Sequence, residues 1–109
     1  MIKRFYTIRK SAEITADEQS DAVDVSDSDE LAVYLNVTEV SSGDTLDVTI
    51  EDSPDGNTWY THTAFTQVSA PTKEAKRITN FGKFIRVNCD VTGSDVSITF
   101  EVLAIGRNQ

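Results

Sequence analysis

The strongest constraint on the fold is an alternation of apolar and polar residues that recurs along much of the chain. In the segment 31–38, Leu, Val, Leu and Val alternate with Ala, Tyr, Asn and Thr, and the segments 46–51, 85–90 and 96–102 repeat this period of two. Successive side chains of a β-strand point to opposite faces, so each segment predicts a strand with one buried face. We find no helical period long enough to predict a helix.

Turn-forming residues separate these predicted strands. Gly, Pro, Asn, Asp and Ser cluster at 41–44, 53–57 and 91–95, and the Asp55-Gly56 pair tolerates the positive φ angles of tight hairpins. About seven or eight short strands separated by such turns are typical of an all-β fold. We therefore predict an antiparallel β-sandwich, either immunoglobulin-like or a jelly roll.

Three further segments have less regular patterns. We predict a turn at 15–20, and a strand at 58–66 that turns Trp59 inward together with the face of either Tyr60 or Phe65. In the last strand, two apolar residues, Leu103 and Ile105, lie on the nominally polar face. Their position predicts that this strand is covered on both sides.

Charge is distributed unevenly over the 109 residues, whose net charge is −8. Residues 1–10 hold four bases and no acid, residues 11–55 hold fourteen acids and no base, and residues 56–109 hold six bases and four acids. We interpret residues 1–10 as a basic arm or first strand and residues 11–109 as a single sandwich domain. The acidity argues against nucleic acid as a partner.

Neither a membrane span nor a secretory signal is predicted. No stretch approaches the ~20 apolar residues that cross a bilayer, and no apolar region follows the basic N-terminus. The single cysteine, Cys89, cannot form an internal disulfide and fits a chain made in a reducing cytosol. It alternates with Ile85 and Val87, so we expect a buried, inert thiol.

No catalytic, cofactor or metal site is predicted. The only histidine, His62, has no serine, cysteine and carboxylate at a spacing that suggests a nucleophile and base. Four acids cluster between residues 24 and 30: Asp24, Asp27, Asp29 and Glu30. This loop lacks the glycine and distal glutamate of a helix-loop-helix calcium site, and we interpret it as a solvated turn. We therefore expect a protein that is not an enzyme.

The segment Leu46–Trp59, a strand followed by Ser-Pro-Asp-Gly and a tryptophan, resembles small β-sandwich proteins encoded among the structural genes of tailed bacteriophages and prophages. The run Arg77–Val87 and the acidic stretch Asp21–Val25 add to this likeness, which extends over about residues 11–106. The resemblance implies a virion structural protein made in the bacterial cytoplasm. Within that group it implies a capsid decoration (cement) protein, or a head–tail or tail accessory subunit.

The implied partners are the major capsid protein or other virion subunits, and a homo-oligomer such as a trimer is left open. We expect the N-terminal residues Lys3, Arg4, Phe5, Tyr6 and Arg9 to contact the partner. Deletion of residues 1–10 is expected to leave the domain folded but to abolish capsid binding. An alternative role is a carbohydrate- or host-receptor-binding module. Its flat rings would be Tyr34, Trp59 and Tyr60, although aromatic rings also serve in core and sheet packing.

Overall fold

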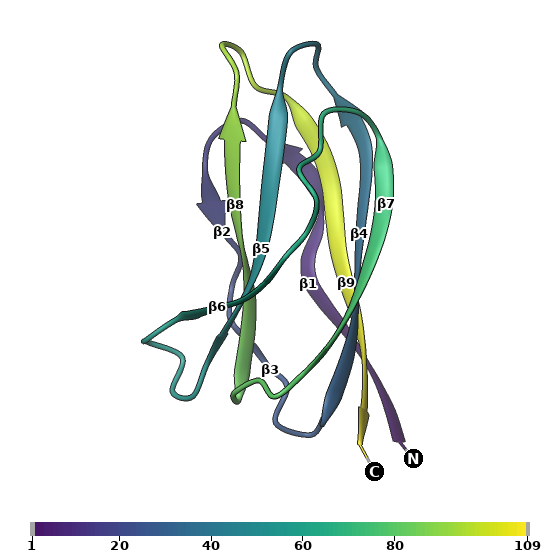
Figure 1. The fold of residues 1–109 in the computed structure, drawn as a ribbon, viewed down its shortest axis with the longest axis vertical. Helices are drawn as coiled ribbons and strands as arrows, with labels where there is room; N and C mark the ends of the chain where they lie inside the picture. The colour runs from purple at the N-terminus through teal and green to yellow at the C-terminus, as the bar shows by residue number, and fades with distance from the viewer. Residues whose placement is uncertain (1, 109) are drawn as a thin grey trace.

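Two antiparallel sheets pack face to face in the computed structural model, which describes residues 2–108 (Figure 1). Sheet A has the order β1-β9-β4-β7, and its strands are β1 (Ile2–Ile14), β9 (Ile98–Asn108), β4 (Glu30–Val40) and β7 (Thr72–Thr79). Sheet B has the order β2-β8-β5-β6, with β3 also paired to β8. Its strands are β2 (Glu18–Gln19), β3 (Val23–Asp24), β8 (Phe84–Thr92), β5 (Thr45–Ser53) and β6 (Tyr60–Ala64).

The order of the strands decides between the two predicted sandwich types. The strands β2 and β3 both pair with β8 and act as one interrupted strand, so two sheets of four strand positions result. Sheet A pairs the first strand antiparallel with the last, whereas a constant-type immunoglobulin sandwich has its first and last strands in different sheets. Eight positions interleaved in this way form a jelly roll. The predicted all-β antiparallel sandwich is therefore confirmed, in its jelly-roll form.

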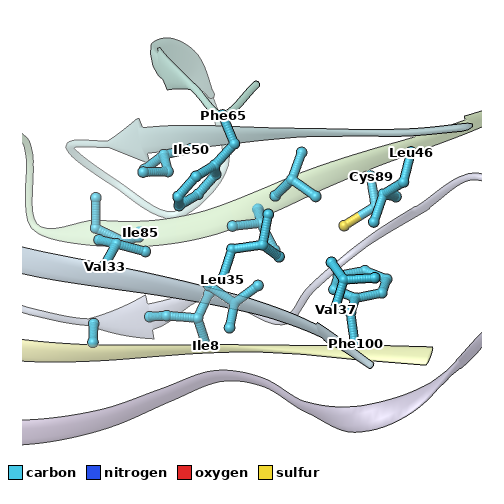
Figure 2. Close-up of a cluster of buried hydrophobic side chains, with 14 of the residues drawn as sticks. Ile8, Val33, Leu35, Val37, Leu46, Ile50, Phe65, Ile85, Cys89 and Phe100 are labelled. Atoms are coloured by element: carbon cyan, nitrogen blue, oxygen red, sulfur yellow. The ribbon is translucent and has the colours of Figure 1, made fainter. Parts of the chain in front are cut away.

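The alternating segments supply the core between the sheets. Along β4 and β5 the predicted apolar residues are at most 2% exposed, and along β8 and β9 they are fully buried. Figure 2 shows these side chains meeting from both sheets, with Val33 and Leu35 of β4 and Phe100 of β9 on one side and Ile50 and Ile85 on the other. Burying each such side chain contributes about 1.5–3 kcal/mol.

The basic N-terminal segment is part of sheet A. Residues 2–10 belong to β1, which continues to Ile14 and pairs with β9 along its length, from Ile2 opposite Asn108 to Ile14 opposite Ile98. Its Ile8 is 4% exposed and contributes to the core. Deleting residues 1–10 would remove most of this strand, together with the buried Ile8 and Arg9, so we now expect the deletion to destabilise the domain. Met1 and Gln109, which the predicted ranges include, lie outside the described residues.

Two local predictions differ from the structure. The predicted turn at 15–20 contains β2, which extends sheet B. The predicted inward position of Trp59 is wrong, although Phe65 is buried as its alternation required. The reason is a bulge at His62, because Thr63 pairs with Ile50 whereas Thr61 pairs with the next residue of β5. One extra residue moves every preceding side chain to the other face of a strand.

A buried arginine fastens β1 to the rest of the sandwich. Arg9 is 7% exposed, and it lies where the pairing of β1 with β9 shifts register twice. Its Nη1 donates to the carbonyl oxygens of Phe100, at 2.6 Å, and Ala12, at 3.0 Å. Its Nε donates to Glu18 Oε2 at 3.0 Å, and its guanidinium lies 3.9 Å from the centre of the Phe100 ring. The side chain therefore ties the first strand, the last strand and β2 together.

We predict that Arg9→Leu lowers the free energy of unfolding by about 2–4 kcal/mol, because it leaves a carboxylate and buried carbonyls without their donor. Arg4→Leu on the same strand is the matched control. Arg4 is exposed and lies 3.6 Å from Asp27, so its loss should cost less than about 0.5 kcal/mol. Urea denaturation measures both. Equal stability of the two variants would contradict the role given to Arg9.

Candidate functional site

The five N-terminal residues predicted to contact a partner separate into two groups. Lys3, Arg4 and Phe5 are exposed, and Phe5 is 67% exposed. Tyr6 packs partly against the core, and its hydroxyl lies 2.9 Å from the Ser28 hydroxyl. Arg9 has its donors engaged inside the domain, as described above. Lys3, Arg4 and Phe5 are thus the members whose side chains a partner can reach.

Pairing with β9 explains why Phe5 points outward. Tyr6 lies opposite Ala104, which is buried, whereas Phe5 lies opposite Ile105 on the other face of the sheet. Strand alternation therefore places Phe5 on the outer face of sheet A, where it has Ile105 as its cross-strand neighbour. Leu103 lies on the same face, opposite Thr7. Both apolar β9 residues are only partly buried, so no element described here covers them fully.

The three aromatic residues predicted for a glycan site do not form one platform. Tyr34 is 38% exposed and lies opposite Leu103, on the outer face of sheet A. Tyr60 is the first residue of β6 in sheet B, and Trp59 directly precedes it. The Arg86 guanidinium lies 4.3 Å from the centre of the Trp59 ring, and Tyr60 is 57% exposed. The sandwich therefore separates Tyr34 from the other two rings.

A shallow groove runs beside Tyr34 on the outer face of sheet A. Its walls come from β4, β7 and β9, and the residues that line it are Tyr34, Leu35, Asn36, Lys73, Glu74, Ala75, Glu101 and Leu103. Sequence reasoning missed the contribution of β7, because nothing in the pattern of residues 72–79 shows which strand they pair with. The apolar Leu103 and Ile105 were the sequence signals that this face differs from an ordinary solvated one.

The two side chains considered for nucleophilic chemistry, His62 and Cys89, are each held in a local structural environment. His62 Nε2 donates to the Thr79 carbonyl at 2.8 Å, and Nδ1 lies 2.8 Å from the Thr63 hydroxyl. Cys89 is buried, as predicted, and burial raises the pKa of its thiol to about 12. Because the thiolate is the reactive form, this environment makes the thiol inert.

The acids of residues 24–30 are directed to separate partners. Asp24 accepts hydrogen bonds from the backbone and hydroxyl of Ser26, which lower the pKa of its carboxyl. Asp27 lies near Arg4, and Glu30 lies 3.7 Å from Arg107. Among residues 2–108, no three His, Cys, Asp or Glu side chains group in a way that could hold a metal ion. The same residues include no helix of the length and apolarity that a membrane crossing requires.

Neither a protein-family model nor a curated protein sequence matches the chain. Several solved structures share its fold. The PBSX exported protein XepA superposes with a TM-score of 0.71 at 16% identity, over 97% of this chain and 38% of XepA. A protein of Bacillus endospore appendages gives 0.60 at 13% identity, over 96% and 88% of the two chains. The SPBc2 prophage-derived protein YomS gives 0.59 at 11% identity, over 96% and 94%.

These similarities are at the level of the fold, because the sequence identities are low. This chain spans about two-fifths of XepA and nearly the full length of YomS and of the appendage protein. The sandwich therefore occurs both as a whole small protein and as one part of a larger one.

We predict that Cys89 of the folded protein reacts with a thiol reagent at pH 8 at least about a hundred times more slowly than Cys89 of the urea-unfolded chain. Absorbance with Ellman's reagent measures both rates. The unfolded thiol ionises near pH 9 and the folded thiol near 12, so the stability that the neutral thiol contributes should fall as the pH rises through this interval. Rapid labelling of the folded chain would contradict the burial of Cys89.

Proposed function

We propose that this chain is a non-enzymatic bacteriophage virion structural protein that binds the outside of the capsid and stabilises the shell. The observation that carries the proposal is the match of nearly the whole chain to the fold of YomS, a prophage-derived protein of nearly the same length. The sequence motifs at Leu46–Trp59 and Arg77–Val87 point to the same group of proteins. The fold of the exported protein XepA and of the spore-appendage protein supports a role at a surface.

The proposed mechanism is adhesive. A decoration protein that binds the assembled shell better than its free subunits stabilises the shell by mass action. The exposed Lys3, Arg4 and Phe5 of β1 would supply part of the contact with the major capsid protein. A position at the head–tail junction or on the tail would use the same chemistry on a different neighbour.

We predict that Phe5→Ser lowers binding to phage particles that lack this chain by at least about tenfold, because exposed aromatic residues often dominate the energy of an interface. Tyr60→Ser is the matched control, since it removes an aromatic ring of comparable exposure from sheet B. Occupancy after co-sedimentation with purified particles is the measurement. Thermal unfolding of both variants verifies that they fold.

Two results would overturn the proposal in different ways. Absence of wild-type binding to the heads and tails of the particles would contradict a virion role. Binding to tails alone would contradict capsid decoration and favour a tail accessory subunit.

A second candidate function, carbohydrate binding on the virion, is favoured by the groove beside Tyr34. Polar groups that suit a sugar lie next to the ring, with Asn36 Nδ2 donating to Glu101 Oε1 at 3.5 Å and Lys73 opposite Asn36. Flat rings stack on sugar faces, and a few placed polar groups orient a ligand. Because Tyr60 lies in the other sheet and Trp59 directly precedes it, this site would depend on Tyr34 alone.

If the chain binds glycans there, Tyr34→Ala should reduce binding at least about tenfold, whereas Trp59→Ala should leave it unchanged. A glycan array followed by titration of any positive glycan measures the effect. An array without wild-type signal, or equal loss in both variants, would rule out this groove as the sugar site.

A further inference from the structure

The outer face of sheet A carries a continuous apolar patch. Cross-strand pairs place Phe5, Ile105 and Ala32 in one row, and Leu103, Tyr34 and Ala75 in the next. The rows cross all four strands, because Thr7 completes the second row on β1 and Arg77 completes the first on β7. Thr7 and Arg77 are polar, so we define the apolar patch as the other six residues of the two rows: Phe5, Ile105, Ala32, Leu103, Tyr34 and Ala75. Contiguous exposed apolar surface of this kind marks binding sites more often than isolated exposed residues do.

Charged residues border the apolar patch on both sides. Lys3, Arg107 and Glu30 form the row above it, and Glu101, Asn36 and Lys73 form the row below. With Arg77, these four rows hold four cations and two carboxylates, and the next row of the face adds Glu13 and Glu39 on either side of Thr99. One of these carboxylates, Glu30, is already 3.7 Å from Arg107. The border of the apolar patch is therefore net positive, although the chain as a whole has a net charge of −8.

The outer face of sheet B has the opposite character. Asp47 and Asp90 lie directly opposite each other there, and Glu51 pairs with Arg86 at 2.7 Å. Thr49 and Asn88 occupy the row between these pairs. This face is polar and acidic along the pairing of β5 with β8, so it differs from the apolar patch and its border in both polarity and charge.

This contrast argues against a second copy of the chain as the occupant of the patch. Two copies packed patch to patch would oppose two positive rims. Stacking sheet A on the sheet B of another copy would match the charges but would place the apolar patch on polar side chains. Neither arrangement gives the centre of the face an apolar partner and the border an oppositely charged one at the same time.

We propose that the outer face of sheet A docks on a different protein, whose surface is apolar at the centre of the contact and bears carboxylates at its rim. This inference rests on the proposed virion role and identifies the chemistry of the neighbour. Four strands and four rows measure only about 15 by 20 Å. This is smaller than the roughly 800 Å² per partner of a standard interface. Binding should therefore depend on a few central residues and respond strongly to one misplaced charge.

The test places the same new charge on either outer face. Ala75→Glu puts a carboxylate into the apolar patch, and Ala64→Glu puts one on sheet B, where Ala64 lies opposite Thr49. Both alanines are exposed strand residues, so both variants should fold. We expect Ala75→Glu to lower the affinity for phage particles that lack the chain at least thirtyfold, about 2 kcal/mol, and Ala64→Glu to change it less than about threefold.

A second pair of variants tests the charge of the partner. Arg77→Glu reverses a rim charge, and Lys83→Glu reverses an exposed charge that lies by the Phe84 ring in sheet B. We expect Arg77→Glu to weaken binding about tenfold or more and Lys83→Glu to leave it within threefold. Raising the salt concentration from about 0.05 to 0.5 M should weaken wild-type binding, and it should weaken that of the Arg77→Glu variant less.

The outcomes separate this inference from the proposed function. If the wild-type chain binds the particles and all four variants bind equally well, the chain has a virion role but sheet A is not its docking face. If Arg77→Glu binds more tightly, the partner is basic and the stated chemistry is wrong. If analytical ultracentrifugation shows self-association that Ala75→Glu abolishes, a second copy occupies the patch. If the patch variants lower binding only to a glycan, the partner is not a protein.

Discussion

The pairing of the first strand with the last is the constraint on which the rest of this structure depends. It places β9 between β1 and β4 in sheet A, and it forms the side of the core to which Ile8 and Phe100 belong. It also determines the outer face. Wherever one residue of β1 points into the core, the next residue points outward beside its partner on β9. Phe5 reaches the surface next to Ile105 only because Tyr6 lies opposite the buried Ala104. The proposed interface is therefore a consequence of the same register that builds the core.

Arg9 has a central part in this arrangement that its sequence context conceals. The sequence places Arg9 among four basic residues within ten positions, a context that predicts a solvated charge. Two of the other bases, Lys3 and Arg4, are indeed exposed. Two register shifts in β1 turn its side chain inward, where backbone carbonyls and Glu18 receive its donors. Bulges are not visible in residue identities, so sequence reasoning assigned Arg9 to the partner surface. The bulge at His62 misled the prediction for Trp59 in the same way.

The features that the sequence predicted correctly follow from the alternation of apolar and polar residues, which corresponds directly to the two faces of a folded strand. Alternation at 31–38, 46–51 and 85–90 identified the strands, their buried faces and the sandwich, because burial of one face is decided within each strand. Pairing between strands is decided by contacts distant in sequence, so jelly roll and immunoglobulin orders stayed equivalent until β1 was seen beside β9. The candidate surface was accessible only in fragments: Phe5 was recognised in the basic segment, and Leu103 and Ile105 as misplaced apolar residues.

The uneven charge of the sequence acquires its meaning from this topology. Basic residues are confined to the first ten positions and the second half of the chain, and the jelly roll places strands from both regions, β1, β7 and β9, in sheet A. The acidic stretch contributes β2, β3 and β5 to sheet B, and it enters sheet A through β4 and the last residues of β1. A linear separation of charge thus becomes a difference between the border of the apolar patch and the outer face of sheet B. For a protein proposed to act through its surface, that difference can fix which side meets the partner, because repulsion disfavours the reverse orientation on an acidic neighbour.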